Sequence, residues 1–456
     1  TNTDFFCGNL KGITKHLKYI KKLGVKIVYL SPVCRSQSNH RYDTADYLSI
    51  DPYLGSAEDM KELCQKAHEL GMKVIIDTVF NHTGDDSIYF NRLSTFPEIG
   101  AFSGRDSKYF DWYKKDGFNN FQFWWNFGNL PVCNPDCKDW QNFLFGENGV
   151  IDTWFRKWGI DGLRLDVADE LPDYFLTMVR DSAQKYKKDA FILGEVWENA
   201  IRKNDGNRKY LLGTSLHSVM NYPFTNAILK YVRFHDSYYL ENTINEICAD
   251  YPQGALLSTM NSLSTHDIPR AITTLVGNGM LYNAYEWIWD IGNKDRNWQN
   301  AHDSTFTHSD YKKGKELLKS ALSILYFLPG NPCIFYGDEV GLYGYKDPWN
   351  RKTYPWEHRD KKLMRFYRTL GKVHNALPLA NADFKFISVT SNTVMYERTF
   401  KDKRILVSVN ITDTIQPNHV PEKYKDDKII FSTNHSSKKQ LTPYGLTIVS
   451  NCNLKF

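Results

Sequence analysis

The sequence lacks the features that mark two common classes of protein. Its net charge is only +5 over 456 residues, and it contains no block of lysine and arginine like that of a nucleic-acid binder. Its longest apolar stretch, residues 321–336, is interrupted by Pro329, Gly330 and Pro332, which leaves no segment long enough to span a bilayer. We therefore expect neither a nucleic-acid partner nor a membrane partner.

Cysteine is scarce and irregularly spaced, with eight residues in the chain. Only Cys133 and Cys137 lie close together, and no further ligands are placed nearby to complete a zinc site. We therefore expect no metal at this pair, and a local disulfide stays open. The chain starts at Thr1, which is compatible with a removed signal peptide. The compartment stays open, with the cytoplasm slightly favoured over secretion.

Aromatic residues are abundant instead, with 12 Trp, 28 Tyr and 27 Phe. Such residues serve cores at least as often as surfaces, but an exposed ring can also pack against the flat apolar face of a sugar. Both interpretations are open for Trp124 and Trp125.

Short apolar runs, each ending in a polar residue, alternate with segments of helical period. The helix expected over residues 56–70 begins at Ser56 as N-cap and ends before Gly71. This alternation predicts βαβ units and a parallel sheet. Because no glycine-rich phosphate loop follows any run, we favour a (β/α)₈ TIM barrel over a doubly wound open sheet. The runs are residues 25–32, 73–82, 161–169, 190–197, 216–223, 258–267 and 331–339.

These runs supply only seven barrel strands, so we expect the first strand to be missing from this chain. Residues 83–134 interrupt the alternation after the third barrel strand and predict an inserted lobe. Short strands separated by turns from residue 380 onward predict a C-terminal antiparallel β-sandwich domain. The predicted domains are therefore a catalytic barrel of residues 1–82 and 135–379, the lobe, and a β domain of residues 380–456.

Four acidic residues, Asp77, Asp166, Glu195 and Asp267, stand at or near the ends of these runs. In a barrel those ends converge, and burying so much charge is costly unless it is paired. Clustered carboxylates beside a cation suit glycoside hydrolysis, in which one carboxylate attacks the sugar and another protonates the leaving oxygen. Arg164 would keep a neighbouring carboxylate ionised, and it would repel a metal ion. We therefore expect no catalytic metal.

Four stretches together resemble the signature regions of glycoside hydrolase family 13, the α-amylase family, in their order and spacing. The resemblance implies a retaining enzyme that acts on α-glucosidic bonds and requires no cofactor. These stretches are "DTVFNH" at 77–82, "GLRLDVADE" at 162–170, "GEVW" at 194–197 and "STHD" at 264–267.

The resemblance also implies a role for each matching residue. Asp166 would be the nucleophile, Glu195 the general acid/base, and Asp267 a third carboxylate that binds hydroxyls of the distorted sugar. Asp77 would be structural and bonded to Arg164. The expected substrate-binding residues are His40, Tyr42, His82, Arg164, Trp197, His266, Asp347 and Arg351.

Calcium is a further implication of the family. Asn81 matches a position that binds calcium in many α-amylases. Since the other ligands are not evident, we interpret Asn81 as structural and do not assign a calcium site.

Further stretches, such as "FYGDEVGLYGYKDPWNRKTYPW" at residues 335–356, resemble the neopullulanase, cyclomaltodextrinase and amylopullulanase group. Asp169 stands where this group usually has Asn, Ile268 replaces the usual Thr, and Val132 and Cys133 also differ. The expected activity is cleavage of α-1,4 bonds in starch and maltooligosaccharides. Pullulan, cyclodextrins and α-1,6 bonds are left open as substrates.

Two alternatives remain open from the sequence. One is a transglycosidase that uses the same site, and the other is a non-catalytic glucan-binding relative. Relatives of the second kind usually lose one of the acids, whereas this chain has all three. The expected partner is an α-glucan, and the protein is expected to be a monomer or a homodimer.

Overall fold

The computed structural model of the chain describes residues 3–276, 306–345 and 347–452. The chain divides into two compact units. The first comprises Thr1–Val196 and Ala200–Val219, and the second comprises Trp197–Asn199 and Met220–Phe456. This division falls inside the predicted barrel, and the predicted limits of barrel, lobe and β domain stay a prediction.

The first unit is built on a parallel sheet of five strands in the order β1-β4-β5-β6-β7. Both faces of the central strands are buried, which is typical of a parallel sheet covered by helices. Gly162 allows β5 to approach β6, because a Cβ atom there would lie 2.2 Å from the Phe191 oxygen. The strands are β1 (Ile27–Leu30), β4 (Lys73–Thr78), β5 (Gly162–Leu165), β6 (Phe191–Gly194) and β7 (Ser218–Val219).

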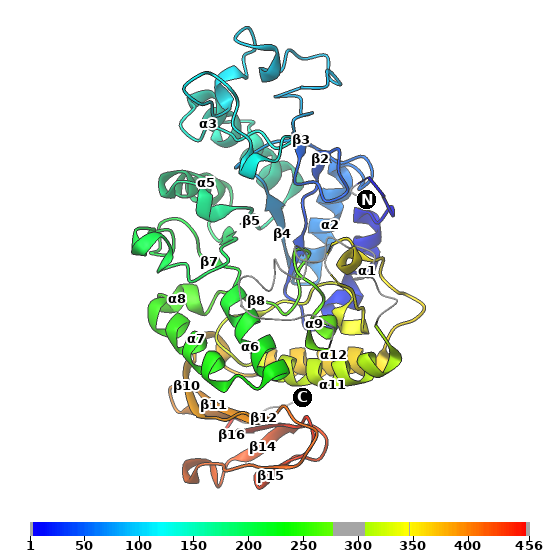
Figure 1. Cartoon of the computed structure of the whole chain (residues 1–456), viewed down its shortest axis with the longest axis vertical. Coiled ribbons are helices and arrows are strands. Elements are labelled where there is room, and N and C mark those ends of the chain that lie inside the picture. Colours follow the sequence, from blue (N-terminus) through cyan, green and yellow to red (C-terminus); the bar gives the residue numbers. More distant parts are fainter. Residues whose placement is uncertain (1–2, 277–305, 346, 453–456) are drawn as a thin grey trace. The chain divides into compact units, whose positions relative to one another are not determined.

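Helices accompany these strands, and Figure 1 shows α2 beside β4. The predicted start of α2 is confirmed, since the Ser56 side chain accepts from the Asp59 amide and Asp59 binds the Ser56 amide in return. A short antiparallel pair, β2 (Cys34–Ser36) and β3 (Thr44–Ile50), lies between β1 and α2. The helices are α1 (Leu10–Lys22), α2 (Ala57–Glu69), α3 (Lys138–Phe145), α4 (Val150–Asp152), the π-helix η4 (Thr153–Trp158) and α5 (Asp173–Tyr186).

Residues 83–134 contain the short 3₁₀ turns η1 (Ala101–Ser103), η2 (Phe110–Trp112) and η3 (Trp124–Asn126). Aromatic side chains pack this segment closely. Phe90, for example, lies with its ring centroid 4.9 Å from those of Tyr113 and Phe121. Most of the aromatic residues of this segment therefore pack against one another. Packing is one of the two interpretations that the sequence left open for aromatic residues.

The second unit continues the parallel pattern with β8 (Met260–Asn261) and β9 (Asn331–Pro332), which pair with each other. Across the described parts of both units, all seven predicted strands are present at their predicted positions. The expectation that a first barrel strand is missing stays a prediction. The helices of this unit are α6 (Tyr222–Phe234), α7 (Ser237–Asp250), α8 (Gln253–Leu256), α9 (Ala271–Val276), α11 (His308–Leu325) and α12 (Lys361–Ala376).

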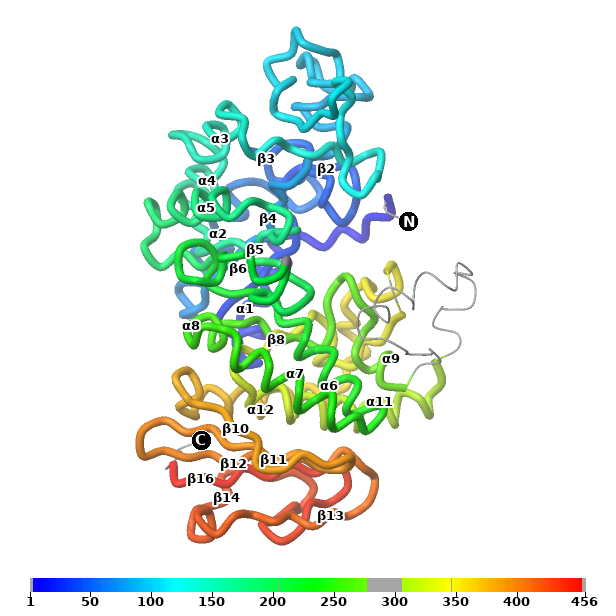
Figure 2. Tube along the Cα trace, turned by 60° about the vertical axis from the view of Figure 1, so that its left-hand side comes forward, coloured from blue at the N-terminus to red at the C-terminus, as the bar shows by residue number. Residues whose placement is uncertain are grey.

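The second unit ends in antiparallel β structure, as predicted (Figure 2). A five-stranded sheet has the order β10-β11-β12-β16-β14, and β13 pairs with β15. In the part of the chain that the structure describes, no helix has both the length and the apolar character needed to cross a bilayer. The strands are β10 (Asp383–Val389), β11 (Thr393–Phe400), β12 (Lys403–Asn410), β13 (Gln416–Pro417), β14 (Lys428–Ser432), β15 (Gln440–Leu441) and β16 (Leu446–Ser450).

Candidate active site

Arg164, near the end of β5, joins three carboxylates from three neighbouring strands. Its side chain is fully buried, and Nη1 lies 2.8 Å from Asp77 Oδ1 and 2.9 Å from Asp166 Oδ1. Its Nη2 lies 2.9 Å from Glu195 Oε1. The strands β4, β5 and β6 are parallel neighbours, so their carboxyl ends bring these side chains to the same edge of the sheet. The predicted contact between Asp77 and Arg164 is confirmed.

Asp77 is held as a structural anion by two further donors. The hydroxyls of Tyr29 and Tyr42 donate to its Oδ2 atom over 2.6 Å and 2.7 Å. Sequence reasoning missed Tyr29, although its place in the apolar run of β1, which pairs with β4, could have suggested it. With Arg164 on the other oxygen, Asp77 has no oxygen left for a substrate, which agrees with its predicted structural role.

One guanidinium therefore faces three carboxylates, and the cluster carries excess negative charge. Burial, together with the Glu195 carboxylate, raises the pKa of Asp166 well above its usual value, and Arg164 opposes this shift. We infer that the Asp166–Glu195 pair keeps a proton to a higher pH than two separate carboxyls would. In a pair that shares one proton, the protonated carboxyl can act as a general acid and the ionised carboxylate can act as a nucleophile.

The turn after β5 corrects one expectation. The run 161–169 predicts a strand that continues through Val167, but β5 ends at Leu165 and Val167 has φ 48° and ψ 39°. A β-branched residue rarely adopts this left-handed conformation, because its branched side chain crowds the backbone there. The turn aims the Val167 amide at Glu195 Oε2, 2.9 Å away. This strained residue therefore fixes the carboxylate on the neighbouring strand.

Tyr42, His40 and His82 lie beside this cluster in the first unit. The rings of His40 and Tyr42 are stacked with centroids 5.9 Å apart, and the Tyr42 amide donates to His40 Nδ1. His82 stacks on Trp124 at 5.2 Å, and burial lowers its pKa to about 3. The imidazole of His82 is therefore neutral at any ordinary working pH. A sugar hydroxyl would meet a hydrogen-bonding group there rather than a charge.

The remaining predicted site residues form a group in the second unit. Asp267 Oδ2 lies 3.2 Å from His266 Nε2, and Asp267 Oδ1 lies 4.0 Å from Arg351 Nη2. Arg351 also pairs with Asp347, 3.4 Å from Nε to Oδ1. The structure thus brings His266, Asp267, Asp347 and Arg351 together, and their expected binding of substrate stays a prediction. Sequence reasoning missed Asn350, whose amide donates to the His266 oxygen over 2.9 Å and shapes this turn.

Trp197, also in the second unit, stacks on Tyr222 with ring centroids 3.9 Å apart and planes at 6°. Its expected place at the leaving-group side stays a prediction. Asn81 is buried and its amide contacts His82 Nδ1 at 3.3 Å, in line with a structural role. No group of three or more potential metal ligands occurs among the residues described in the structure, and all eight cysteines are free.

Asp169 is where the sequence departs from the expected group, and the structure shows a partner for it. Its carboxylate forms an ion pair with Lys203, and Arg208 donates to its backbone oxygen. Arg208 also lies 2.8 Å from Asp173. These contacts tie the segment after β6 to the turn after β5, so the loops that follow the two carboxylates are joined. An asparagine at position 169 would carry no charge to pair with Lys203.

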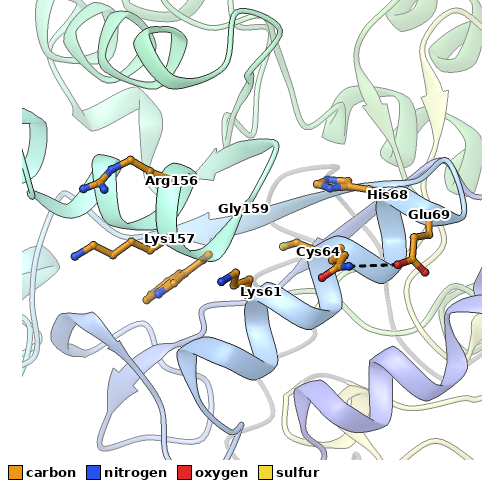
Figure 3. A pocket seen from close by; sticks show the side chains of 9 residues that line it. Lys61, Cys64, His68, Glu69, Arg156, Lys157 and Gly159 are labelled. Atoms are coloured by element: carbon orange, nitrogen blue, oxygen red, sulfur yellow. Dashed lines mark hydrogen bonds between the residues drawn. The ribbon is translucent and has the colours of Figure 1, made fainter.

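A surface pocket of about 350 Å³ lies between α2 and the η4 segment (Figure 3). Its lining includes none of the predicted site residues. Two of its basic groups already have partners, since Arg156 Nε lies 2.6 Å from Asp152 and His68 Nε2 lies 2.8 Å from Asp161. We assign no function to this pocket.

Removal of the Arg164 charge should destabilise the protein strongly. In Arg164→Met three buried carboxylates lose their shared cation, and we expect the free energy of unfolding to fall by about 3–5 kcal/mol at neutral pH. Urea unfolding measures this, and Arg164→Lys is the control, since it keeps the charge but not the planar fork. Equal stability of Arg164→Met and the wild type would show that the cluster is not held by this cation.

His82 should make the protein less stable in acid. The unfolded chain takes up a proton on His82 below about pH 6.5, whereas the folded protein does so only near pH 3. Its contribution to stability is therefore complete above pH 6.5 and decreases as the pH falls, by about 1.4 kcal/mol per pH unit. Compared with the wild type, His82→Gln should show a correspondingly flatter dependence of unfolding free energy on pH. Parallel curves for the two proteins between about pH 6 and pH 4 would contradict this.

Comparison with known sequences agrees with the geometry. The family model described as "Alpha amylase, catalytic domain" matches residues 1–375. The amylopullulanase of Thermoanaerobacter thermohydrosulfuricus is 33% identical over 493 residues, which covers 98% of this chain and 32% of that protein. A cyclomaltodextrinase from Bacillus sp is 33% identical over 428 residues, which covers 90% of this chain and 67% of that protein.

Solved structures give the same result. The cyclic α-maltosyl-(1→6)-maltose hydrolase from Arthrobacter globiformis matches with a TM-score of 0.80 and 25% identity, over 99% of this chain and 91% of that one. The type III pullulan hydrolase from Thermococcus kodakarensis matches with a TM-score of 0.78 and 27% identity, over 97% and 71%. The chain spans only about a fifth to a third of the length of the amylopullulanases that it matches.

Proposed function

This chain belongs to the α-amylase family, and we propose that it is a retaining glycoside hydrolase that cleaves α-glucosidic bonds of α-glucans. The observation that supports this most directly is the buried Arg164 that binds both Asp166 and Glu195. A single guanidinium keeps two carboxylates as neighbours, and a retaining mechanism needs such a closely spaced pair. The expected full set of acids, with Asp267 as the third, argues against a non-catalytic relative.

In the proposed reaction Asp166 attacks the anomeric carbon and forms a covalent glycosyl intermediate, while Glu195 protonates the leaving oxygen. Glu195 then accepts a proton from the water that cleaves the intermediate. In this structure Glu195 Oε2 accepts a hydrogen bond from the Val167 amide, and Glu195 Oε1 forms an ion pair with Arg164 Nη2. Delivery of the proton to the substrate therefore requires one of these two contacts to open.

The matched relatives suggest the substrates to test. They are named amylopullulanase, cyclomaltodextrinase and cyclic α-maltosyl-(1→6)-maltose hydrolase. We propose α-1,4 bonds of starch and maltooligosaccharides as the main target, with pullulan, cyclodextrins and α-1,6 bonds as further substrates of the same site. The departures at Asp169 and Ile268 leave the preference among them to experiment. We propose a monomer or homodimer as the working form, which light scattering of the purified protein tests.

A product profile on starch, pullulan and a cyclodextrin tests the proposal. Panose from pullulan indicates a neopullulanase, maltotriose indicates α-1,6 cleavage, and activity on starch but not on pullulan indicates a plain α-amylase. Products longer than the substrate would identify a transglycosidase. NMR of the first product should show the α-anomer, since the mechanism retains configuration. Release of the β-anomer, or no release from any α-glucan, would overturn the proposal.

A further inference from the structure

Glu170 connects the nucleophile's turn to two tryptophans of residues 83–134. Its Oε2 accepts the indole N–H of Trp124 over 3.0 Å, and its Oε1 accepts that of Trp125 over 2.9 Å. Glu170 belongs to the 3₁₀ turn η5 (Ala168–Glu170), which begins two residues after Asp166. Bonds to a carboxylate are stronger than neutral hydrogen bonds, so both rings are positioned with respect to the catalytic turn.

Trp125 has a backbone conformation that packing does not explain. Its φ is 46° and its ψ is 31°, a left-handed conformation that bulky residues rarely adopt. Yet Trp125 is 56% exposed, so burial of the residue does not compensate for this strain. Strain that persists at an exposed position points to a functional constraint.

Phe127 is a second exposed aromatic residue, with 53% of its surface accessible. The Trp124 ring centroid lies 5.3 Å from that of Trp125 and 5.9 Å from that of Phe127. We call Trp124, Trp125 and Phe127 the aromatic ledge. Its inner ring, Trp124, stacks on His82, and its outer two rings face solvent. The ledge thus extends from a predicted sugar-binding residue to the surface of the protein.

Resting on the proposed function, we propose that the aromatic ledge binds a glucose unit of the α-glucan outside the ring that is cleaved. A glucose ring presents apolar C–H faces that pack on an aromatic ring, while its hydroxyls remain in water. Glu170 is a positioning residue in this proposal. Both of its oxygens bind the indoles, so it fixes the direction of the ledge rather than contacting the sugar.

The test compares chains of different length. In Trp125→Ala the ratio of kcat/KM for maltoheptaose to kcat/KM for maltotriose should fall about three- to tenfold, the range expected for loss of one ring contact. Phe118→Ala removes another exposed aromatic of residues 83–134, outside the ledge, and should leave the ratio unchanged. A uniform loss at both lengths in Trp125→Ala, or no loss at either, would overturn the proposal.

Two further variants separate the ring from its anchor. Trp125→Phe keeps a ring but loses the indole donor, and Glu170→Gln keeps one acceptor oxygen for two indoles. Both should lower the ratio less than Trp125→Ala does. If Trp125→Ala does not fold, as judged by thermal unfolding, the test uses these two variants instead. An unchanged ratio of the two kcat/KM values in both variants would then reject sugar binding by the ledge.

A binding measurement distinguishes failure of this inference from failure of the proposed function. In the Glu195→Gln background, calorimetry should show weaker maltoheptaose binding when Trp125→Ala is added. Equal affinity with and without Trp125→Ala would reject the ledge while leaving the hydrolase proposal intact. A wild-type protein that binds maltoheptaose through Trp125 but never cleaves it would reject the hydrolase proposal and keep the ledge.

Discussion

Asp166→Asn should lower kcat by roughly 10⁴-fold or more while the protein remains folded. The amide cannot form the covalent intermediate, so the whole advantage of nucleophilic catalysis is lost. The fold should persist, because the Asn oxygen can still accept from Arg164 and Arg164 keeps its bonds to Asp77 and Glu195. Steady-state kinetics on a maltooligosaccharide, with thermal unfolding as the folding control, measures both effects.

The same variant should be more stable than the wild type at neutral pH. Because burial and Glu195 raise the pKa of Asp166, the folded protein binds a proton there more tightly than the unfolded chain does. The contribution of Asp166 is therefore complete at acid pH and lost as the pH rises through the raised value. Asparagine does not titrate, so the difference in unfolding free energy between Asp166→Asn and the wild type should grow in favour of the variant from acid to neutral pH. A stability difference that is the same at every pH would contradict this.

Glu195→Gln should lower kcat by about 10³-fold on natural glucans, where the leaving oxygen needs a proton. On an aryl α-maltooligoside with an acidic phenol the first step needs little help, so the loss should be smaller there. The basic limb of the pH–rate profile should also disappear, because the group that must stay protonated is gone. A similar loss on both substrate types would argue that Glu195 is not the acid.

External azide distinguishes the roles of the two carboxylates. With Asp166→Ala and an activated aryl α-maltooligoside, azide replaces the missing nucleophile in one displacement and should yield the β-glycosyl azide. With Glu195→Ala the covalent intermediate still forms, and azide opens it to the α-glycosyl azide. If each variant gives the other's product, the assignments must be exchanged, and if neither gives an azide product, both are wrong.

The sequence predicted the strands well, because a buried parallel strand needs a continuous apolar run and each run here ends in a polar group. The contact of Arg164 with Asp77 was also predictable, since Cα pairing across β4 and β5 puts these residues side by side. The signature stretches were informative for the same reason. Each joins the end of a strand to a side chain that the proposed mechanism uses.

Other parts of the site depend on contacts between distant segments, which no local pattern reports. Val167 follows alternating residues that read as strand, and only the bond from its amide to Glu195 explains its left-handed backbone. In the sequence Glu170 resembles an ordinary surface acid. Its role depends on the fold of residues 83–134, which brings the indoles of Trp124 and Trp125 within hydrogen-bond distance of it. Sequence reasoning missed both positions, as it missed Tyr29 and Asn350.

The ion pair between Asp169 and Lys203 has a consequence for how such enzymes diverge. An acid at position 169 is favourable only when the loop after β6 supplies a cation. Without an acid at position 169, a lysine at position 203 would add little stability. In a set of homologous chains the two positions should therefore covary, with Lys or Arg at 203 wherever Asp stands at 169, and neutral residues at 203 where 169 is Asn. A change at one position alone would be an evolutionary intermediate that selection soon corrects at the other.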